Sequence, residues 1–89
     1  MLEIKVETRA GKFLKKILYK HAQQIVRKID ALAINPFPPD SKQLKGSIYR
    51  GTDIGEYRII YKIEEQTLRV YLIGKRNDDE VYRKLKRME

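Results

Sequence analysis

Two consecutive strand patterns in the last third of the chain constrain its fold more than any other feature. From Tyr57 to Ile63, apolar and polar residues alternate with the period of two that is typical of a strand. One face would carry Tyr57, Ile59, Tyr61 and Ile63, and the other face Arg58, Ile60 and Lys62. The segment 64–67 predicts a hairpin turn, and Leu68 to Lys75 predicts a last strand that is buried on both faces. The chain must therefore build a sheet that is mainly antiparallel.

The N-terminal part predicts one short strand and two helices. Leu2, Ile4 and Val6 alternate with charged residues, as in a half-buried strand, and Thr8 is placed to cap the helix that follows. Apolar residues then recur at helical spacing in two sets: Ala10, Phe13, Leu14, Ile17 and Leu18, and then Ala22, Ile25, Val26, Ile29, Leu32 and Ala33. The segment 19–21 predicts a short joint and hence an antiparallel pair of helices, and Asn35-Pro36 ends the second one.

The remaining segments complete the predicted order β-α-α-β-β-β-α. Asn35 to Asp40 predicts a stiff loop, 48–50 the start of a strand, and Gly51 to Gly55 a turn. Asp78 or Asp79 can cap a short C-terminal helix. We expect one α+β domain over residues 1–89, with a mainly antiparallel four-stranded sheet and the helical hairpin on one face.

Composition limits the environment and the partners. The chain has 89 residues and a net charge of +8, which favours nucleic acid, an anionic membrane or an acidic protein as a partner. It contains no cysteine, so disulfides and thiolate metal sites are excluded. We see neither a signal peptide nor an apolar run of the roughly 20 residues that a membrane span needs. A soluble, cytoplasmic protein is expected.

Cations on neighbouring strands are the first candidates for a site. Arg58 lies mid-strand, where its planar fork can hold a phosphate, or where it can instead pair with Glu56 or another carboxylate. Lys75 and Arg76 follow Gly74 at a strand end, a place where sites form, although a solvated basic loop is the plainer interpretation. Arg50 could add a cation from the preceding strand.

Tyr82, near the start of the predicted last helix, is the candidate for proton transfer. An ordinary tyrosine has a pKa near ~10, too high for a base at neutral pH, and cations beside it would lower that value. Packing of the ring on the sheet is the commoner fate of such a residue. His21 is the only histidine, so a paired-histidine ribonuclease site is excluded, and we expect it at a helix end or on the surface.

The whole ordered set of motifs resembles the RelE/ParE superfamily of toxins from bacterial and archaeal toxin–antitoxin systems, specifically the RelE-like messenger-RNA interferases. The resemblance covers nearly the full chain. It is carried by the β-α-α start and by four sequence motifs: Lys42-Gln43-Leu44-Lys45-Gly46, Gly55-Glu56-Tyr57-Arg58-Ile59-Ile60-Tyr61, Ile73-Gly74-Lys75-Arg76 and Glu80-Val81-Tyr82.

The resemblance implies an endoribonuclease that enters the ribosomal A site and cleaves messenger RNA by attack of the 2′-hydroxyl on the adjacent phosphate, with no metal and no other cofactor. Arg58 and Arg76 would stabilise the charge on the phosphorane. Tyr82 would transfer a proton or orient the nucleotide, and Arg50 would stand in for a first catalytic lysine. A cognate antitoxin would inhibit the toxin, and operator DNA would be bound only through that antitoxin.

One departure from the family pattern concerns a second catalytic lysine. The segment from Tyr49 to Tyr57 is one residue shorter here, and Thr52 or Asp53 occupies the place of that lysine. Lys45 and Lys75, which we expect to bind RNA, are the candidates to replace it.

Two alternatives to the ribonuclease remain at this point. One is a ParE-like toxin that binds DNA gyrase without cutting RNA. The other is a catalytically weakened member that only binds its antitoxin. The combination of Arg58, Arg76 and Tyr82 favours the nuclease, because the gyrase-binding branch generally lacks the full set.

Overall fold

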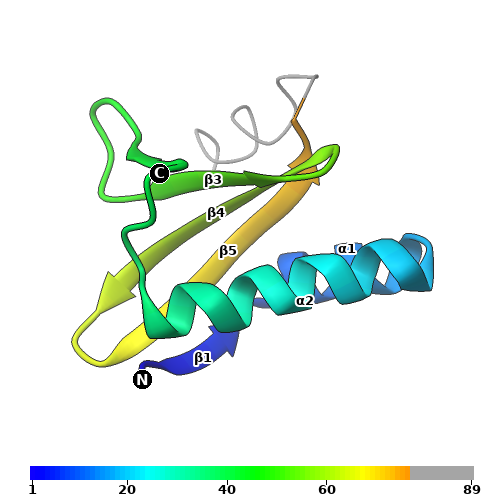
Figure 1. Ribbon diagram of the computed structural model, residues 1–89, viewed down its shortest axis with the longest axis horizontal. Helices are drawn as coiled ribbons and strands as arrows, with labels where there is room; N and C mark the ends of the chain where they lie inside the picture. The colour runs from blue at the N-terminus through cyan, green and yellow to red at the C-terminus, as the bar shows by residue number, and fades with distance from the viewer. Residues whose placement is uncertain (77–89) are drawn as a thin grey trace.

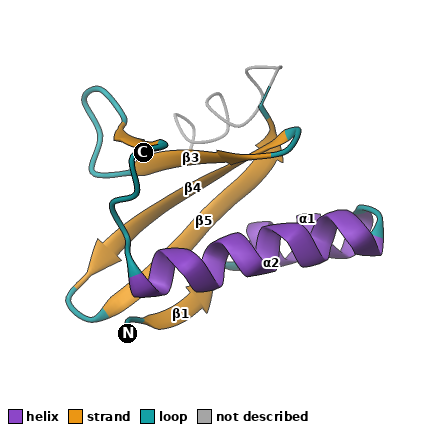
Figure 2. Ribbon diagram, viewed as in Figure 1, coloured by secondary structure: helices purple, strands orange, loops and turns teal. Residues whose placement is uncertain are grey.

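The structure is a computed structural model that describes residues 1–76. It confirms the α+β class and, within these residues, contains two helices and five strands (Figure 1, Figure 2). The elements in chain order are β1 (Glu3–Val6), α1 (Thr8–Lys16), α2 (Tyr19–Ile34), β2 (Ser41–Gln43), β3 (Arg50–Ile54), β4 (Tyr57–Glu64) and β5 (Thr67–Lys75). The predicted C-terminal helix lies outside the described residues.

The five strands form one mixed sheet in the order β1-β5-β4-β3-β2. The pair β1–β5 is parallel and the other three pairs are antiparallel, which agrees with a mainly antiparallel sheet. The expected number of four strands was too low, because β2 adds a fifth at one edge. With only three residues, β2 is too short to show a strand periodicity, and it forms because its backbone pairs with the start of β3.

A two-residue turn joins β3 to β4 and sets their register. Ile54 lies opposite Tyr57, so only Gly55 and Glu56 lie between the strands. Gly55 has a φ of +58°, a left-handed conformation that glycine adopts without a steric penalty. The turn that was predicted within residues 51–55 therefore begins at the last of them, since β3 continues to Ile54. This register places Asp53 directly opposite Arg58.

Strand β5 carries one extra residue relative to β4. Ile60 pairs with Leu72 and Tyr61 with Val70, which leaves Tyr71 as a β-bulge. The extra residue shifts the alternation by one position, and as a result Val70 and Ile73 both face the helices although three positions separate them.

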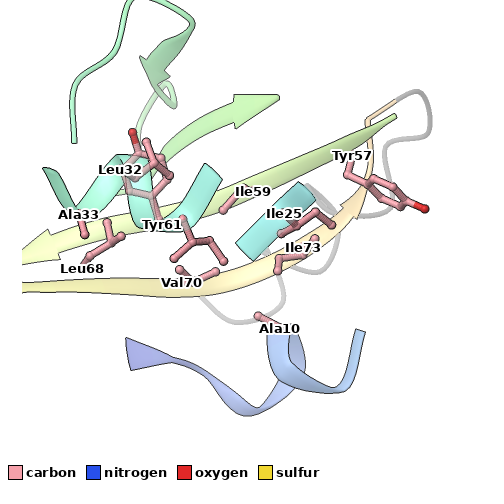
Figure 3. Close-up of a cluster of buried hydrophobic side chains, with 11 residues drawn as sticks. Ala10, Ile25, Leu32, Ala33, Tyr57, Ile59, Tyr61, Leu68, Val70 and Ile73 are labelled. Atoms are coloured by element: carbon pink, nitrogen blue, oxygen red, sulfur yellow. The ribbon is translucent and has the colours of Figure 1, made fainter. Parts of the chain in front are cut away.

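Both faces of the sheet carry buried apolar residues. Helices α1 and α2 cover one face, called here the helix face (Figure 1). Figure 3 shows the cluster beneath them, to which the helices contribute Ala10, Ile25, Ile29, Leu32 and Ala33 and the strands Tyr57, Ile59, Tyr61, Leu68, Val70 and Ile73. A smaller cluster lies on the other side, called the opposite face: Leu44, Tyr49, Ile60 and Leu72. The predicted division of β4 into two faces is confirmed.

The helices differ from the prediction at their ends. Thr8 is already the first residue of α1, and Glu7 is its N-cap without a side-chain hydrogen bond, so the predicted cap by Thr8 was wrong. The joint is 17–18 rather than 19–21, because α2 begins at Tyr19. Leu18 in this joint is exposed. Neither helix of the described residues is both long and apolar enough to cross a membrane.

His21 is not a simple surface residue. Its Nδ1 lies 2.7 Å from the hydroxyl of Tyr57, and the two rings make an edge contact. Tyr57 is the first residue of β4 and is followed by Arg58. The contact therefore ties the first turn of α2 to the strand end that carries Arg58.

The hydroxyl of Tyr61 allows a test of how much one contact between the sheet and the loop after α2 contributes to stability. It donates a hydrogen bond of 2.7 Å to the carbonyl of Pro36, which joins β4 to the loop after α2. Replacing Tyr61 by Phe keeps the buried ring and removes this bond, so we expect the free energy of unfolding to fall by about 1 kcal/mol. Urea denaturation followed by circular dichroism measures the free energy of unfolding of both proteins. Equal stability of the two proteins would show that the bond contributes nothing.

Candidate functional site

The site begins with an ion pair on the opposite face. Arg58 of β4 donates two hydrogen bonds to its neighbour across the strands: its Nε lies 2.6 Å from Oδ1 of Asp53, and its Nη2 lies 3.2 Å from Oδ2. Because the guanidinium holds both carboxylate oxygens, its orientation on the sheet is fixed. The side chain of Arg58 is 21% exposed, so solvent still reaches it.

Arg76 comes to the same place from the end of β5. Its backbone N–H donates a hydrogen bond of 3.0 Å to the carbonyl of Glu56, in the turn that precedes β4. This contact anchors Arg76 beside the end of the strand that carries Arg58, although its side chain is exposed. The structure therefore places the two predicted catalytic arginines at the same end of the sheet.

The electrostatics of Asp53 show that cations surround it. The hydrogen bonds from Arg58 hold the pKa of Asp53 below its ordinary value, against the opposing effect of partial burial. The charges of Arg58, Arg76 and Lys42 lower this pKa further. A group placed at the carboxylate of Asp53 is thus stabilised when it is negative. This is an environment suited to an anion.

A polar hollow lies beside the ion pair. Its volume is about 200 Å³, and its lining residues are Asp40, Lys42, Gly51, Thr52, Asp53 and Arg58. Gly51 sits between Lys42 on β2 and Ile60 on β4, and the absence of a side chain there leaves space between the two neighbours. A hollow of this size and polarity, with cations in its wall, can accept a phosphate group.

Arg50 is not part of this cluster. It pairs with Tyr61, which places it on the helix face, away from Arg58. Its guanidinium lies over the ring of Phe37, 4.9 Å from the centroid, and donates a 3.0 Å hydrogen bond to Oγ of Ser41. The expectation that Arg50 adds a cation to the same site is corrected by this register, which puts Arg50 on the face opposite to Arg58, and by its contacts with Phe37 and Ser41.

The other predicted residues are also separated from Arg58. Lys75 pairs with Tyr57 and so belongs to the helix face, where it is exposed. Lys45 is exposed in the loop between β2 and β3. Neither is brought to the ion pair by strand pairing. Tyr82 lies outside the described residues, and its proposed role stays a prediction.

Two residues of this site were missed from the sequence. Asp53 was placed in a turn and not recognised as the partner of Arg58, and Lys42 was named only as part of the motif 42–46. The signal for Asp53 was present: a two-residue hairpin at Gly55-Glu56 would have put it opposite Arg58. Lys42 had no such signal, because its position depends on the short edge strand β2.

The pH dependence of stability tests the Asp53–Arg58 pair. A carboxyl whose pKa is lower in the folded state stabilises the fold above its unfolded pKa, about 3.9, and this contribution is lost as pH falls through the folded value. We expect Asp53→Asn to lower the melting temperature at pH 7 and the difference from the unmodified chain to shrink below about pH 4. Melting curves across this range measure it. A difference that stays constant with pH would contradict the pairing.

Comparison with solved structures places the fold among bacterial and archaeal toxins. Free RelE from Escherichia coli, with two arginines replaced by alanine, matches with a TM-score of 0.82 and 20% identity over 99% of this chain and 98% of that chain. The RelBE2 toxin–antitoxin complex of Mycobacterium tuberculosis matches with a TM-score of 0.76 and 20% identity over 84% and 98%. The archaeal RelE–RelB complex of Pyrococcus horikoshii matches with a TM-score of 0.76 and 20% identity over 85% of this chain and 96% of that chain. At these identities the likeness establishes the fold.

The family follows from a match of the sequence itself. None of the curated proteins matches this chain. The model of the ParE toxin of the type II toxin–antitoxin system parDE, in contrast, matches residues 4–80, which is most of the chain. The match includes β3, β4 and β5, the strands that position Asp53, Arg58 and Arg76. The chain therefore belongs to the ParE toxin family, within the RelE/ParE superfamily of type II toxin–antitoxin systems.

Proposed function

We propose that this toxin is an endoribonuclease that cleaves messenger RNA in the ribosomal A site, without a metal, until an antitoxin inhibits it. The observation that carries the proposal is that Arg58 holds the carboxylate of Asp53 with two hydrogen bonds, while Arg76, anchored at the neighbouring turn, lies near enough for its charge to lower the pKa of that carboxyl. A phosphodiester placed there would meet the same cations.

The reaction needs no group beyond the RNA and the side chains. The 2′-oxygen of the ribose forms a bond to the adjacent phosphorus, and the bond from phosphorus to the 5′-oxygen of the next nucleotide breaks. The 2′-hydroxyl loses a proton to a base, and the departing 5′-oxygen gains one. The products are a 2′,3′-cyclic phosphate and a free 5′-hydroxyl. We assign Tyr82 to one of the two proton transfers.

The two arginines would act on the charge of the transition state. Negative charge builds up on the phosphorane oxygens, and preoriented cations stabilise it at little reorganisation cost. Arg58 is already oriented by its two hydrogen bonds to Asp53. An entering phosphate has to replace the Asp53 carboxylate at this guanidinium, so Asp53 would keep the site assembled in the absence of RNA.

The partner of this chain would be a cognate antitoxin. The structurally similar RelBE2 of Mycobacterium tuberculosis was solved as a toxin–antitoxin complex, and the RelE of Pyrococcus horikoshii as a complex with RelB. A net charge of +8 suits an acidic protein segment as well as RNA. An antitoxin that covers the opposite face would block access to Arg58 and Arg76.

Mapping of RNA 5′ ends after induction in cells tests the ribonuclease directly. We expect new ends within translated codons for the unmodified chain, and a loss of cleavage of about 10²–10³-fold for Arg76→Ala, the range found when one transition-state donor is removed. Tyr82→Phe should also abolish growth arrest. Arg27→Ala is the matched control, because this exposed arginine lies on α2, on the other side of the sheet.

The alternatives give different results in the same experiment. Growth arrest without new RNA ends would contradict cleavage and point to a protein target such as DNA gyrase. Absence of arrest, with antitoxin binding retained, would indicate a member that only binds its antitoxin. Unchanged cleavage by both Arg76→Ala and Tyr82→Phe would remove these residues from the catalytic set.

A further inference from the structure

We propose that Lys42 is a third phosphate-binding residue beside Arg58 and Arg76, and that it contacts the nucleic-acid backbone in the hollow beside Arg58. That the ligand is RNA rests on the proposed function. The position of Lys42 and its charge rest on the structure alone.

Strand register brings Lys42 to the correct face. Lys42 of β2 pairs with Gly51 of β3, and Gly51 pairs with Ile60, a residue of the buried cluster on the opposite face. Paired residues of adjacent strands share a face, so Lys42 lies on the face of Asp53 and Arg58. Asp53 is two positions from Gly51 along β3, which makes Lys42 its diagonal neighbour.

The hollow connects the three side chains. Lys42, Asp53 and Arg58 all line the same space of about 200 Å³, and no side chain at Gly51 separates them. A Cβ added at Gly51 would meet Cδ2 of Leu44 at 3.4 Å and Cδ1 of Ile60 at 3.5 Å. The lining itself is mainly polar, and its charged groups are Asp40, Lys42, Asp53 and Arg58. A ligand in the hollow would meet Lys42 and Arg58 together.

A count of charges shows why Lys42 is available for a ligand. Each of the two carboxylates in the lining has its own cation: Asp53 binds Arg58, and Asp40 lies 2.6 Å from Nζ of Lys28. Among residues 1–76, no carboxylate lies within ion-pair distance of Lys42 or Arg76. Lys42 is therefore the cation of the lining that has no carboxylate partner among residues 1–76, and Arg76 adds a second such cation near Asp53.

A lysine on an edge strand can also serve to prevent pairing with other chains, and the experiment has to distinguish this role from phosphate binding. Charged residues on edge strands prevent pairing with other chains, and β2 is an edge of this sheet. A lysine with only that role would be solvated and would not contribute to the affinity for a polyanion more than any other exposed lysine does.

Salt-dependent binding of a short single-stranded oligodeoxynucleotide distinguishes these roles. This probe lacks 2′-hydroxyls, so the proposed reaction cannot cut it. Fluorescence anisotropy with the purified full-length chain should show that Lys42→Ala weakens binding by about fivefold at low salt. The slope of log affinity against log salt should lose about 0.7, the value for one phosphate contact on a single strand. Lys42→Arg should restore both quantities.

Lys20→Ala is the matched control, since Lys20 is an exposed lysine of α2. It should leave the slope unchanged, and melting curves should show that all variants are folded. An unchanged slope in Lys42→Ala, an equal loss in Lys20→Ala, or no saturable binding by the unmodified chain would each overturn the proposal.

The RNA ends mapped in cells report the proposed function separately. Binding that depends on Lys42, without new RNA ends, would support the phosphate site and contradict the ribonuclease. New RNA ends together with binding that does not depend on Lys42 would support the ribonuclease and remove Lys42 from its site.

Discussion

The two-residue turn at Gly55-Glu56 is the constraint on which the site depends. Because it leaves no spare residue between β3 and β4, it fixes which side chains oppose one another. A slip of one residue would move Asp53 to the helix face and would break its pairing with Arg58. The same turn accepts the hydrogen bond from the backbone of Arg76 through the carbonyl of Glu56. One tight turn therefore positions three members of the cluster.

The carboxylate of Asp53 allows cations that would bind a phosphate to lie close together in the folded chain when no phosphate is present. Cations that are gathered to hold a phosphate repel one another when the phosphate is absent. Asp53 reduces this repulsion, and its hydrogen bonds keep the fork of Arg58 in a single orientation. The side chain of Asp53 is 36% exposed, so water and ligands reach the pair and the carboxylate can be displaced.

The sequence predicts the framework of the fold well, because its long elements have clear periodicities. The faces of β4, the apolar stripe of α2 and the end of that helix before Pro36 all follow from residue spacing. The prediction fails where pairing between strands, rather than local pattern, decides the structure. The short strand β2 and the bulge at Tyr71 are both of this kind.

The prediction of site residues also failed where strand pairing decides the position of a side chain. Arg58 and Arg76 were recognised because each lies in a distinct motif at a strand or a strand end. Arg50 was assigned to the same site as Arg58, because its position in the sequence does not show which face of the sheet it occupies. Its pairing with Tyr61 shows that it lies on the helix face. Asp53 and Lys42 enter the site only through their partners on neighbouring strands.

The parallel pairing of β1 with β5 has a consequence for how the chain folds. Residues 3–6 pair with residues 67–70, so the first strand finds its place only after the hairpin of β4 and β5 is available. Contacts between such distant segments are costly in loop-closure entropy and slow the formation of the sheet. During synthesis, the early segment remains an unpaired strand until almost all of the sheet has been made. The first strand would thus join the sheet only after residues 67–70 have been made.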